Sequence, residues 1–311
     1  MLRRTLLAAS GSDRARRLIT SAPLARDVVA RYVAGDTTAE AVRVSRELLQ
    51  RGLLVSLDYL GEDSTDPEQA AAVTAEYCAL LTQLGEGGLA AGGRAEVSVK
   101  PTAVGLGLAE HGVKTATGNI ARICAAARVA GTTVTVDMED HTRVDQTLRI
   151  AGEIRPDHPD LGVVIQSSLR RSVADCAALA QAGSRVRLCK GAYDAPAEVA
   201  YPARHDVDRS YARALRVLMD GAGYPMIATH DPRLLRIAAA QAELGARTPD
   251  SYEFQMLHGV RPAEQRRLAA TGARLRVYLP YGQDWYRYLV RRLAERPANV
   301  AFFARSLASS H

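Results

Sequence analysis

The sequence predicts a closed α/β barrel of the TIM type, in which eight parallel strands alternate with eight helical segments. Short apolar runs follow one another along the chain, and Ala-, Leu- and Arg-rich segments separate them. Each run also leaves a polar side chain at or near its C-terminal end, where barrels of this kind place their reacting groups. The runs span residues 53–61, 95–104, 132–140, 162–168, 186–193, 225–230, 252–259 and 275–281.

Helical segments precede the first strand. Residues 13–51 read as helical, and the stretch from Gly35 to Thr38 interrupts the pattern. Thr38 begins a second helix, which Gly52 closes. We expect these helices to pack against the barrel or to cap its N-terminal side. The chain therefore divides into an N-terminal helical segment (1–52) and a (β/α)8 catalytic barrel (53–311) within a single domain.

Two connections and the last helix complete the barrel. The Gly-rich stretch 85–94 predicts a loop before the second strand. The polar stretch 194–208 precedes a helix over 209–221, and its position on the catalytic side predicts a lid or a wall of a cofactor site. Residues 285–295 form the final helix, which Pro297 ends.

Composition narrows the class of protein. The 311 residues carry a net charge of +6, but the basic residues are dispersed, which argues against nucleic acid as a partner. Four cysteines without metal spacing fit a reducing compartment. No run is long enough to span a membrane, so we expect a cytoplasmic protein whose basic surface still allows peripheral contact with the inner face of the membrane.

The predicted strand exits supply the candidate site residues. They are Glu62, Lys100, Asp137, Glu139, Gln166, Arg187, Lys190, Tyr193, His230, Leu257 and Tyr278. Only three of the 40 basic residues are lysines, at positions 100, 114 and 190, and two of these three lie at exits. An ammonium group differs chemically from a guanidinium, so Lys100 and Lys190 are the more informative cations.

The final helix carries a candidate carboxylate clamp. Tyr288, Arg291, Arg292 and Glu295 have the spacing i, i+3, i+4 and i+7, so they share one face. Guanidinium groups bind carboxylates through paired hydrogen bonds. The alternative is a solvated helix face on which Arg292 pairs with Glu295.

Charged residues on neighbouring strands predict buried ion pairs. Lys100 and Asp137 end strands two and three, so we expect them to pair, either to orient Lys100 toward an anionic substrate or as a structural pair. Arg187 inside strand five requires an anion or an electron-rich cofactor, or an internal salt bridge to Glu139 or Asp137. His230 could be an acid or base, a metal ligand or a hydrogen-bonding group, and the lack of metal spacing disfavours a metal site.

The motifs, taken in order, resemble the proline dehydrogenase family. The matching segments run from about residue 30 to residue 303: LDYLGE, SVKPTAVG, DMED, IQSSLRRS, RLCKGAY, ATHD, FQMLHG and YLPYG…WYRYLVRRLAERPAN. The length is similar to the short monofunctional bacterial form. The resemblance implies a distorted (β/α)8 barrel that binds FAD across the C-terminal ends of its strands. It also implies oxidation of L-proline to Δ1-pyrroline-5-carboxylate by hydride transfer from C5 to flavin N5.

The resemblance also implies roles for matching residues in substrate binding. Arg291, Arg292 and Lys100 would bind the proline carboxylate, with Glu295 and Asp137 as their orienting partners. The remaining substrate residues are aromatic or apolar: Leu257, Tyr278 and Tyr288 would pack the pyrrolidine ring, and Tyr193 would lie near the arginines.

For the cofactor, the resemblance places Arg187 near flavin N5 and Gln166 near the ring edge. Its other expected contacts are Cys189, Lys190, Gly191, Ala192, Tyr193, Thr229, His230 and Glu295. The sequence departs from the family pattern at Cys189 (commonly Val), Val207 (Thr in some relatives) and Asp231 (often Asn). Tyr278 is retained where hydroxyproline-specific relatives have a smaller residue, which favours proline.

Two other functions compete with proline oxidation. A Schiff-base lyase could use Lys190 or Lys100 as its nucleophile, although an ion pair between Asp137 and Lys100 would oppose this. A non-catalytic basic binding protein is the second. The family resemblance implies a quinone as electron acceptor, and the lack of a GxGxxG motif for a nicotinamide nucleotide agrees with it. It further implies that a separate pyrroline-5-carboxylate dehydrogenase takes the product.

Overall fold

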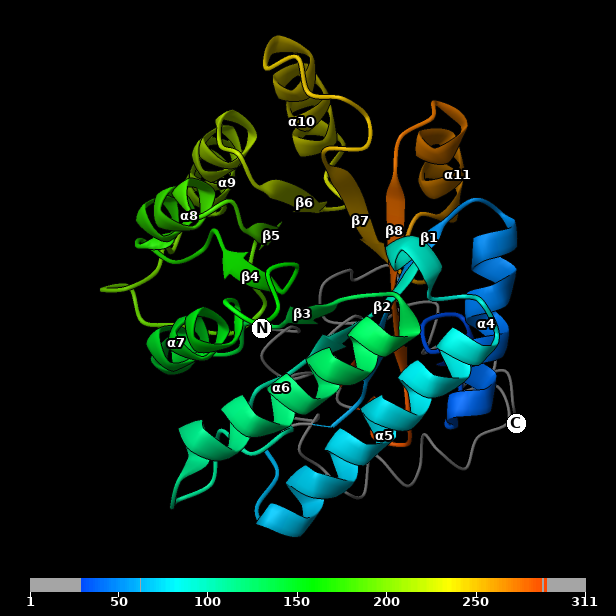
Figure 1. Ribbon diagram of the computed structural model, residues 1–311. Coiled ribbons are helices and arrows are strands. Elements are labelled where there is room, and N and C mark those ends of the chain that lie inside the picture. Colours follow the sequence, from blue (N-terminus) through cyan, green and yellow to red (C-terminus); the bar gives the residue numbers. More distant parts are fainter. Residues whose placement is uncertain (1–28, 62, 287, 290–311) are drawn as a thin grey trace, which may run out of the picture.

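Eight parallel strands close into a barrel in this computed structural model, which describes residues 29–61, 63–286, 288 and 289 (Figure 1). The strands are β1 (Leu54–Tyr59), β2 (Ala95–Val99), β3 (Val134–Val136), β4 (Gly162–Gln166), β5 (Arg185–Cys189), β6 (Tyr224–Ala228), β7 (Glu253–Leu257) and β8 (Leu275–Tyr281). Each pairs with the next, and β8 closes against β1 with Tyr278 opposite Ser56. The predicted fold and all eight predicted strands are confirmed.

Helices surround the strands on the outside (Figure 1). They are α4 (Thr38–Gln50), α5 (Pro67–Glu86), α6 (Gly112–Ala130), α7 (Val144–Ile154), α8 (Ser172–Gln181), α9 (Arg204–Asp220), α10 (Pro232–Leu244) and α11 (Pro262–Ala270), with short 3-10 turns at Ala91–Gly93 and His141–Arg143. The long helices α5 and α6 lie side by side. Gly85 belongs to α5 and not to a loop, and it lets the two helices approach closely, because a Cβ there would lie 3.2 Å from the Ala130 Cα of α6. The predicted loop at 85–94 is therefore too long.

Local sequence signals fix several helix starts. The Thr37 hydroxyl accepts a hydrogen bond from the Glu40 amide, and the Glu40 carboxylate accepts one from the Thr37 amide, which is a capping box. This confirms the predicted start of α4 at Thr38. The predicted start of α9 at 209 is wrong: the helix begins at Arg204. Its first turn carries Asp206, and acidic residues are favourable near the positive end of a helix.

Residues 29–37, which precede α4, lie at the C-terminal end of the barrel, not the N-terminal end. Ala34 N–H donates to Pro280 O at 2.8 Å, and Gly282 N–H donates to Gly35 O at 2.9 Å. Gly259, with φ of +70°, is also close: a Cβ there would lie 1.8 Å from Arg31 O. The division of the chain at residue 52 remains our prediction.

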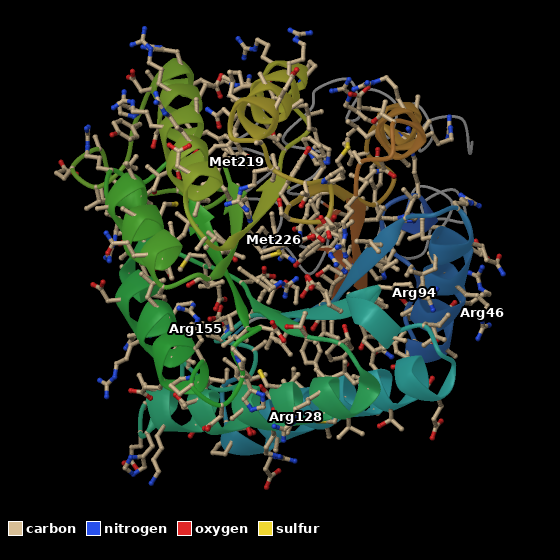
Figure 2. All side chains as sticks on the ribbon, turned by 45° about the horizontal axis from the view of Figure 1, so that its top comes forward. Arg46, Arg94, Arg128, Arg155, Met219 and Met226 are labelled. Carbon is tan, nitrogen blue, oxygen red and sulfur yellow. The ribbon has the colours of Figure 1, made fainter. Side chains whose placement is uncertain are left out.

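The apolar core lies between the strands and the helices. Outward-facing strand residues such as Val55, Leu57 and Val97 are fully buried there. Met226 lies inside the ring of strands, whereas Arg46 and Arg128 lie on the surrounding helices (Figure 2). Among the described residues, none of the helices combines the length and the apolar character that crossing a bilayer would need.

Candidate functional site

Polar side chains fill much of the barrel interior. Inward positions in barrels of this class are usually occupied by Val, Ile and Leu. Here several inward positions carry charged or polar side chains that are almost completely buried: Ser56, Asp58, Glu96, Ser98, Thr135, Arg187, Glu253, Gln255 and Arg276. Burying so many ionisable groups is costly unless each is paired, so the pairing decides what this interior can do.

Arg187 and Asp137 form the centre of the site. The Arg187 Nη1 donates to Asp137 Oδ1 at 2.7 Å, and the Tyr278 hydroxyl donates to Asp137 Oδ2 at 2.8 Å. Arg187 Cζ lies 5.2 Å from the centroid of the Tyr278 ring, a cation–π contact. The internal salt bridge from Arg187 to Asp137 is confirmed. Burial, together with the charge of Asp137, raises the pKa of the Tyr278 hydroxyl well above its ordinary value.

Lys100 has a different partner from the predicted one. Its Nζ lies 2.6 and 2.7 Å from the two carboxylate oxygens of Asp58, so the expected pair with Asp137 is wrong. Asp58 lies on β1 at 1% exposure, opposite Ser98 of β2. Burial raises the pKa of Asp58, and the Lys100 charge opposes that rise. The sequence did offer a signal for Asp58. It lies two residues after Ser56 on the same strand, so both side chains point into the barrel.

Glu139 and Gln166 connect the loops above β2, β3 and β4. The Glu139 carboxylate accepts hydrogen bonds from the Thr102 amide (3.0 Å) and the Thr102 hydroxyl (2.6 Å). The Gln166 side chain donates to Glu139 O at 2.7 Å. Glu139 is therefore not the salt-bridge partner of Arg187, and these contacts brace the barrel mouth.

Lys190 lies in an ion-pair network at the exits of β5 and β6. Its Nζ is 2.5 Å from Asp208 Oδ1 of α9 and 3.1 Å from Asp231 Oδ2, and Arg233 bridges the same two carboxylates. Burial alone would raise the pKa of Asp231, but hydrogen bonds from Arg233 and Lys190 hold it below its ordinary value. The departure from the family pattern at Asp231 thus adds a carboxylate beside Lys190.

The loop after β5 is held against the loop after β4. Tyr201 N–H donates to Ser168 O at 2.8 Å, and Arg170 N–H donates to Val199 O at 2.9 Å. Gly191 has a φ of +101°, and a Cβ there would lie 2.4 Å from Ser168 Oγ. Only glycine fits this close approach, so Gly191, with Ala192 and Tyr193 following it, sits beside the barrel mouth.

His230 acts as a hydrogen-bond acceptor. Its Nε2 accepts from the Leu257 amide at 2.9 Å, and its carbonyl accepts from Arg261 Nη1. These bonds tie the exits of β6 and β7 together, with Thr229 buried beside them. Among the three roles that the sequence left open for His230, these contacts support that of a hydrogen-bonding group.

The predicted carboxylate clamp lies mostly outside the described residues. Its members Arg291, Arg292 and Glu295 fall there, and so does the separate strand-exit candidate Glu62. Tyr288 is described, and it is 5% exposed in an apolar cluster with Val29, Tyr32, Val33, Leu60 and Leu289. Residues 29–33 thus pack against Tyr288 and Leu289, a contact that the sequence did not predict.

Glu96 anchors the lower part of the polar interior. Arg185 Nη2 lies 2.8 Å from one carboxylate oxygen, and Arg187 and Arg276 lie 3.6 and 3.7 Å from the other. Burial disfavours the charged form, but these arginines outweigh it and lower the pKa of Glu96 to about 2. Glu96 therefore stays ionised at neutral pH although it is fully buried.

This shift predicts acid sensitivity. The pKa in the folded protein lies below the ordinary 4.5, so the stabilisation is complete above about pH 4.5 and lost as the pH falls toward about 2. Urea unfolding of the protein between these pH values should show that loss, and Glu96→Gln should show a smaller one. Glu153→Gln, in an exposed pair with Arg149, serves as control and should keep the original dependence. Identical pH dependence in the Glu96→Gln variant would contradict the assignment.

Comparisons with known proteins agree with this geometry. The family model "Proline dehydrogenase" matches residues 41–305. The chain is 40% identical over 281 residues to a proline dehydrogenase of Deinococcus radiodurans, and 35% identical over 277 residues to proline dehydrogenase 1 of Bacillus subtilis, covering 89% of both partners in each comparison. It is 27% identical to the bifunctional protein PutA of Escherichia coli but covers only 24% of that protein, so the match fits the short form.

Solved structures confirm the fold. Proline utilization A of Bdellovibrio bacteriovorus, inactivated by N-propargylglycine, superposes with a TM-score of 0.81 at 24% identity, covering 87% of this chain and 33% of that one. A D778Y mutant of the Bradyrhizobium japonicum protein gives 0.72 at 23% identity, covering 91% and 32%. The sequence matches and the shared barrel lead to one assignment: the chain belongs to the proline dehydrogenase family, whose members are oxidoreductases acting on the CH–NH group of proline.

Proposed function

We propose that the chain oxidises L-proline to Δ1-pyrroline-5-carboxylate with bound FAD, by hydride transfer from C5 of proline to flavin N5. Family membership supports the substrate and the reaction. The observation that carries the cofactor assignment is the buried cation of Arg187 at the floor of the barrel mouth, held by Asp137 and covered by Tyr278. A fixed positive charge in this place suits a cofactor that gains negative charge on reduction.

The residues around Arg187 fit a flavin ring. The inward side chains that end β5 to β8 are half-buried and mainly apolar or aromatic: Cys189, Ala228, Leu257 and Tyr278. Arg187 beneath them is only 4% exposed. FAD, when bound, would supply the two-electron acceptor. The chain would supply an apolar floor, an oriented charge beneath it and, through Gln166, an amide at its edge.

The other parts of the cofactor would follow the exits of β5 and β6. We propose Lys190, Gly191, Thr229 and His230 for the ribityl, phosphate and adenine parts, with Ala192 and Tyr193 beside them. Lys190 supports this assignment as a cation near the barrel mouth, although Asp208 and Asp231 compete for its charge.

Substrate binding would fall to the opposite side of the mouth. We propose Lys100, Arg291 and Arg292 for the proline carboxylate, with Glu295 as an orienting partner. Within the described residues, Asp58 orients Lys100, and Asp137 orients Arg187. Leu257, Tyr278 and Tyr288 would pack the pyrrolidine ring.

A Schiff-base lyase is disfavoured by the observed pairs. Lys100 lies against both oxygens of Asp58, and Lys190 lies between Asp208 and Asp231. These are surroundings of a charged ammonium group, whereas imine formation needs a neutral amine. Purified protein that stays colourless and is trapped by borohydride together with a carbonyl substrate would favour the lyase.

The electron acceptor and product provide a direct test of the reaction. We propose that a quinone reoxidises the flavin during peripheral contact with the inner membrane surface, and that a separate dehydrogenase chain takes the product. Proline should therefore drive reduction of a soluble quinone analogue but not of NAD, and the product should react with o-aminobenzaldehyde as a pyrroline does. Turnover with NAD and none with quinones would contradict the acceptor, and a missing pyrroline would contradict the reaction.

A further inference from the structure

A closed ring of five buried side chains lies beneath the barrel mouth. Arg187 Nε donates to Gln255 Oε1 at 2.6 Å, and Gln255 Nε2 donates to Glu253 Oε1 at 2.6 Å. Glu253 pairs with Arg276 Nε at 2.7 Å. Glu96 closes the ring, because its Oε1 lies 3.7 Å from Arg276 Nε and 3.6 Å from Arg187 Nη2. All five side chains are between 0% and 4% exposed.

Gln255 is the uncharged member of this ring, and its amide has one allowed orientation. The carbonyl oxygen faces the N–H of Arg187, and the amide nitrogen faces the carboxylate of Glu253. A flipped amide would place two donors together on one side and two acceptors together on the other. The charges on both sides therefore fix Gln255, and Gln255 in turn fixes one edge of the Arg187 guanidinium.

The other contacts of Arg187 hold its far edge. Nη1 donates to Ser98 Oγ and Asp137 Oδ1, both at 2.7 Å, and Nη2 donates to Ser56 Oγ at 3.0 Å. The ring of Tyr278 lies 5.2 Å from Cζ. Gln255 is the partner that meets the Nε edge of the guanidinium, so the two edges are held from different strands.

The ring costs more than an apolar filling would. Its two carboxylates and two guanidinium groups balance in charge, but apolar side chains of similar size would fill the barrel without the penalty of removing charges from water. The ion pairs explain how the barrel can bury these charges. They do not explain why charged side chains stand there in place of apolar ones. Because the ring includes Arg187, the cation at the floor of the barrel mouth, it points to a role in orienting that cation.

We propose that Gln255 is a positioning residue: backed by Glu253, it holds the Arg187 guanidinium in the orientation in which it meets the flavin. This inference rests on the proposed role of Arg187. Rigid placement of a charge matters because a displacement of about 1 Å can slow a reaction by about a hundredfold. Gln255 itself would touch neither substrate nor cofactor.

Two substitutions separate orientation from packing. Gln255→Leu removes both amide contacts, and we expect the rate of flavin reduction at saturating proline to fall by about tenfold to a hundredfold, with an unchanged dissociation constant for proline. The midpoint potential of the flavin should shift as well. Tyr211→Phe is the control, because it removes another buried hydrogen bond to β5, from the Tyr211 hydroxyl to Leu188 O, on the outer face of the strand. It should lower stability and leave rate and potential unchanged.

Gln255→Glu adds a pH readout that packing alone would not produce. At low pH the introduced carboxyl and Glu253 would share one proton, which restores one acceptor toward Arg187 and one donor toward Glu253. At higher pH that proton is lost and the two carboxylates repel each other. The reduction rate of this variant should therefore approach that of the original protein on the acidic side and fall as the pH rises. A pH-independent rate, or equal effects of Gln255→Leu and Tyr211→Phe, would overturn the proposal.

A measurement without turnover distinguishes this proposal from the proposed function. In full-length protein labelled with ¹⁵N-arginine, the Nε–H of Arg187 should exchange slowly with water, and exchange should become faster in Gln255→Leu. Unchanged exchange would overturn the positioning role even if proline reduces the flavin. A protein without flavin would instead contradict the proposed function, and faster exchange in the variant would still support the ring as the restraint on Arg187.

Discussion

Replacing Lys100 with methionine is expected to raise the Michaelis constant for proline by about tenfold to a hundredfold, because a charge-assisted hydrogen bond to the carboxylate is lost. The same change leaves Asp58 buried without its cation, which should cost about 3–5 kcal/mol of stability. The two effects need separate measurements, namely steady-state kinetics with proline and urea unfolding.

A double variant separates these effects of Lys100. Lys100→Met with Asp58→Asn leaves no lone charge in the barrel, so stability should recover in part while the Michaelis constant stays high. Lys114→Met on the exposed face of α6 is the matched control and should change neither. A normal Michaelis constant in the double variant would remove Lys100 from the substrate site.

Replacing Arg276 with methionine is expected to destabilise the protein by about 3–5 kcal/mol, because it leaves Glu253 buried without its cation. Arg276 holds both oxygens of Glu253, at 2.7 and 3.0 Å, and also donates to Val55 O at 2.9 Å. In the variant, burial of Glu253 without Arg276 should raise its pKa. The loss of stability should therefore grow as the pH rises and shrink in acid.

Controls for Arg276 come from the residue just before β8 and from the same ion pair. Arg274 is partly exposed and donates to Asp250 O at 3.3 Å, so Arg274→Met should cost less than about 0.5 kcal/mol in urea unfolding. Glu253→Gln combined with Arg276→Met should be more stable than Arg276→Met alone. If the single variant unfolds like the Arg274 control, the buried pair is not the source of the effect.

The strand pattern was predictable because it is local. Apolar runs of strand length, separated by helical segments, appear directly in the sequence, and closure of eight parallel strands follows from their number. The exit position of Lys100 was found in the same way. Its partner was not, because strand two has two neighbours in a barrel: β3 carries Asp137, and β1 carries Asp58. Only the alignment of β2 with its two neighbours determines which of these two carboxylates Lys100 meets.

The ring that includes Arg187 could not be predicted for a related reason. Arg187 and Glu96 are 91 positions apart, and Arg276 and Glu96 are farther apart still. Such contacts depend on the stagger of strands across the barrel, which no local pattern records. The helix start at Arg204 was missed because the polar residues of its first turn resemble a loop. Those residues face solvent, so only the helix-end charge of Asp206 favoured a helix there.

The most direct test of the account is an absorbance spectrum of the purified protein under anaerobic conditions, before and after addition of L-proline. We expect a visible flavin band that proline bleaches, and we expect acid precipitation to release the flavin into the supernatant because it is bound noncovalently. Reoxidation by a quinone analogue should restore the band. A protein without a flavin band, or a band that proline leaves unchanged, would contradict the assignment of FAD-dependent proline oxidation.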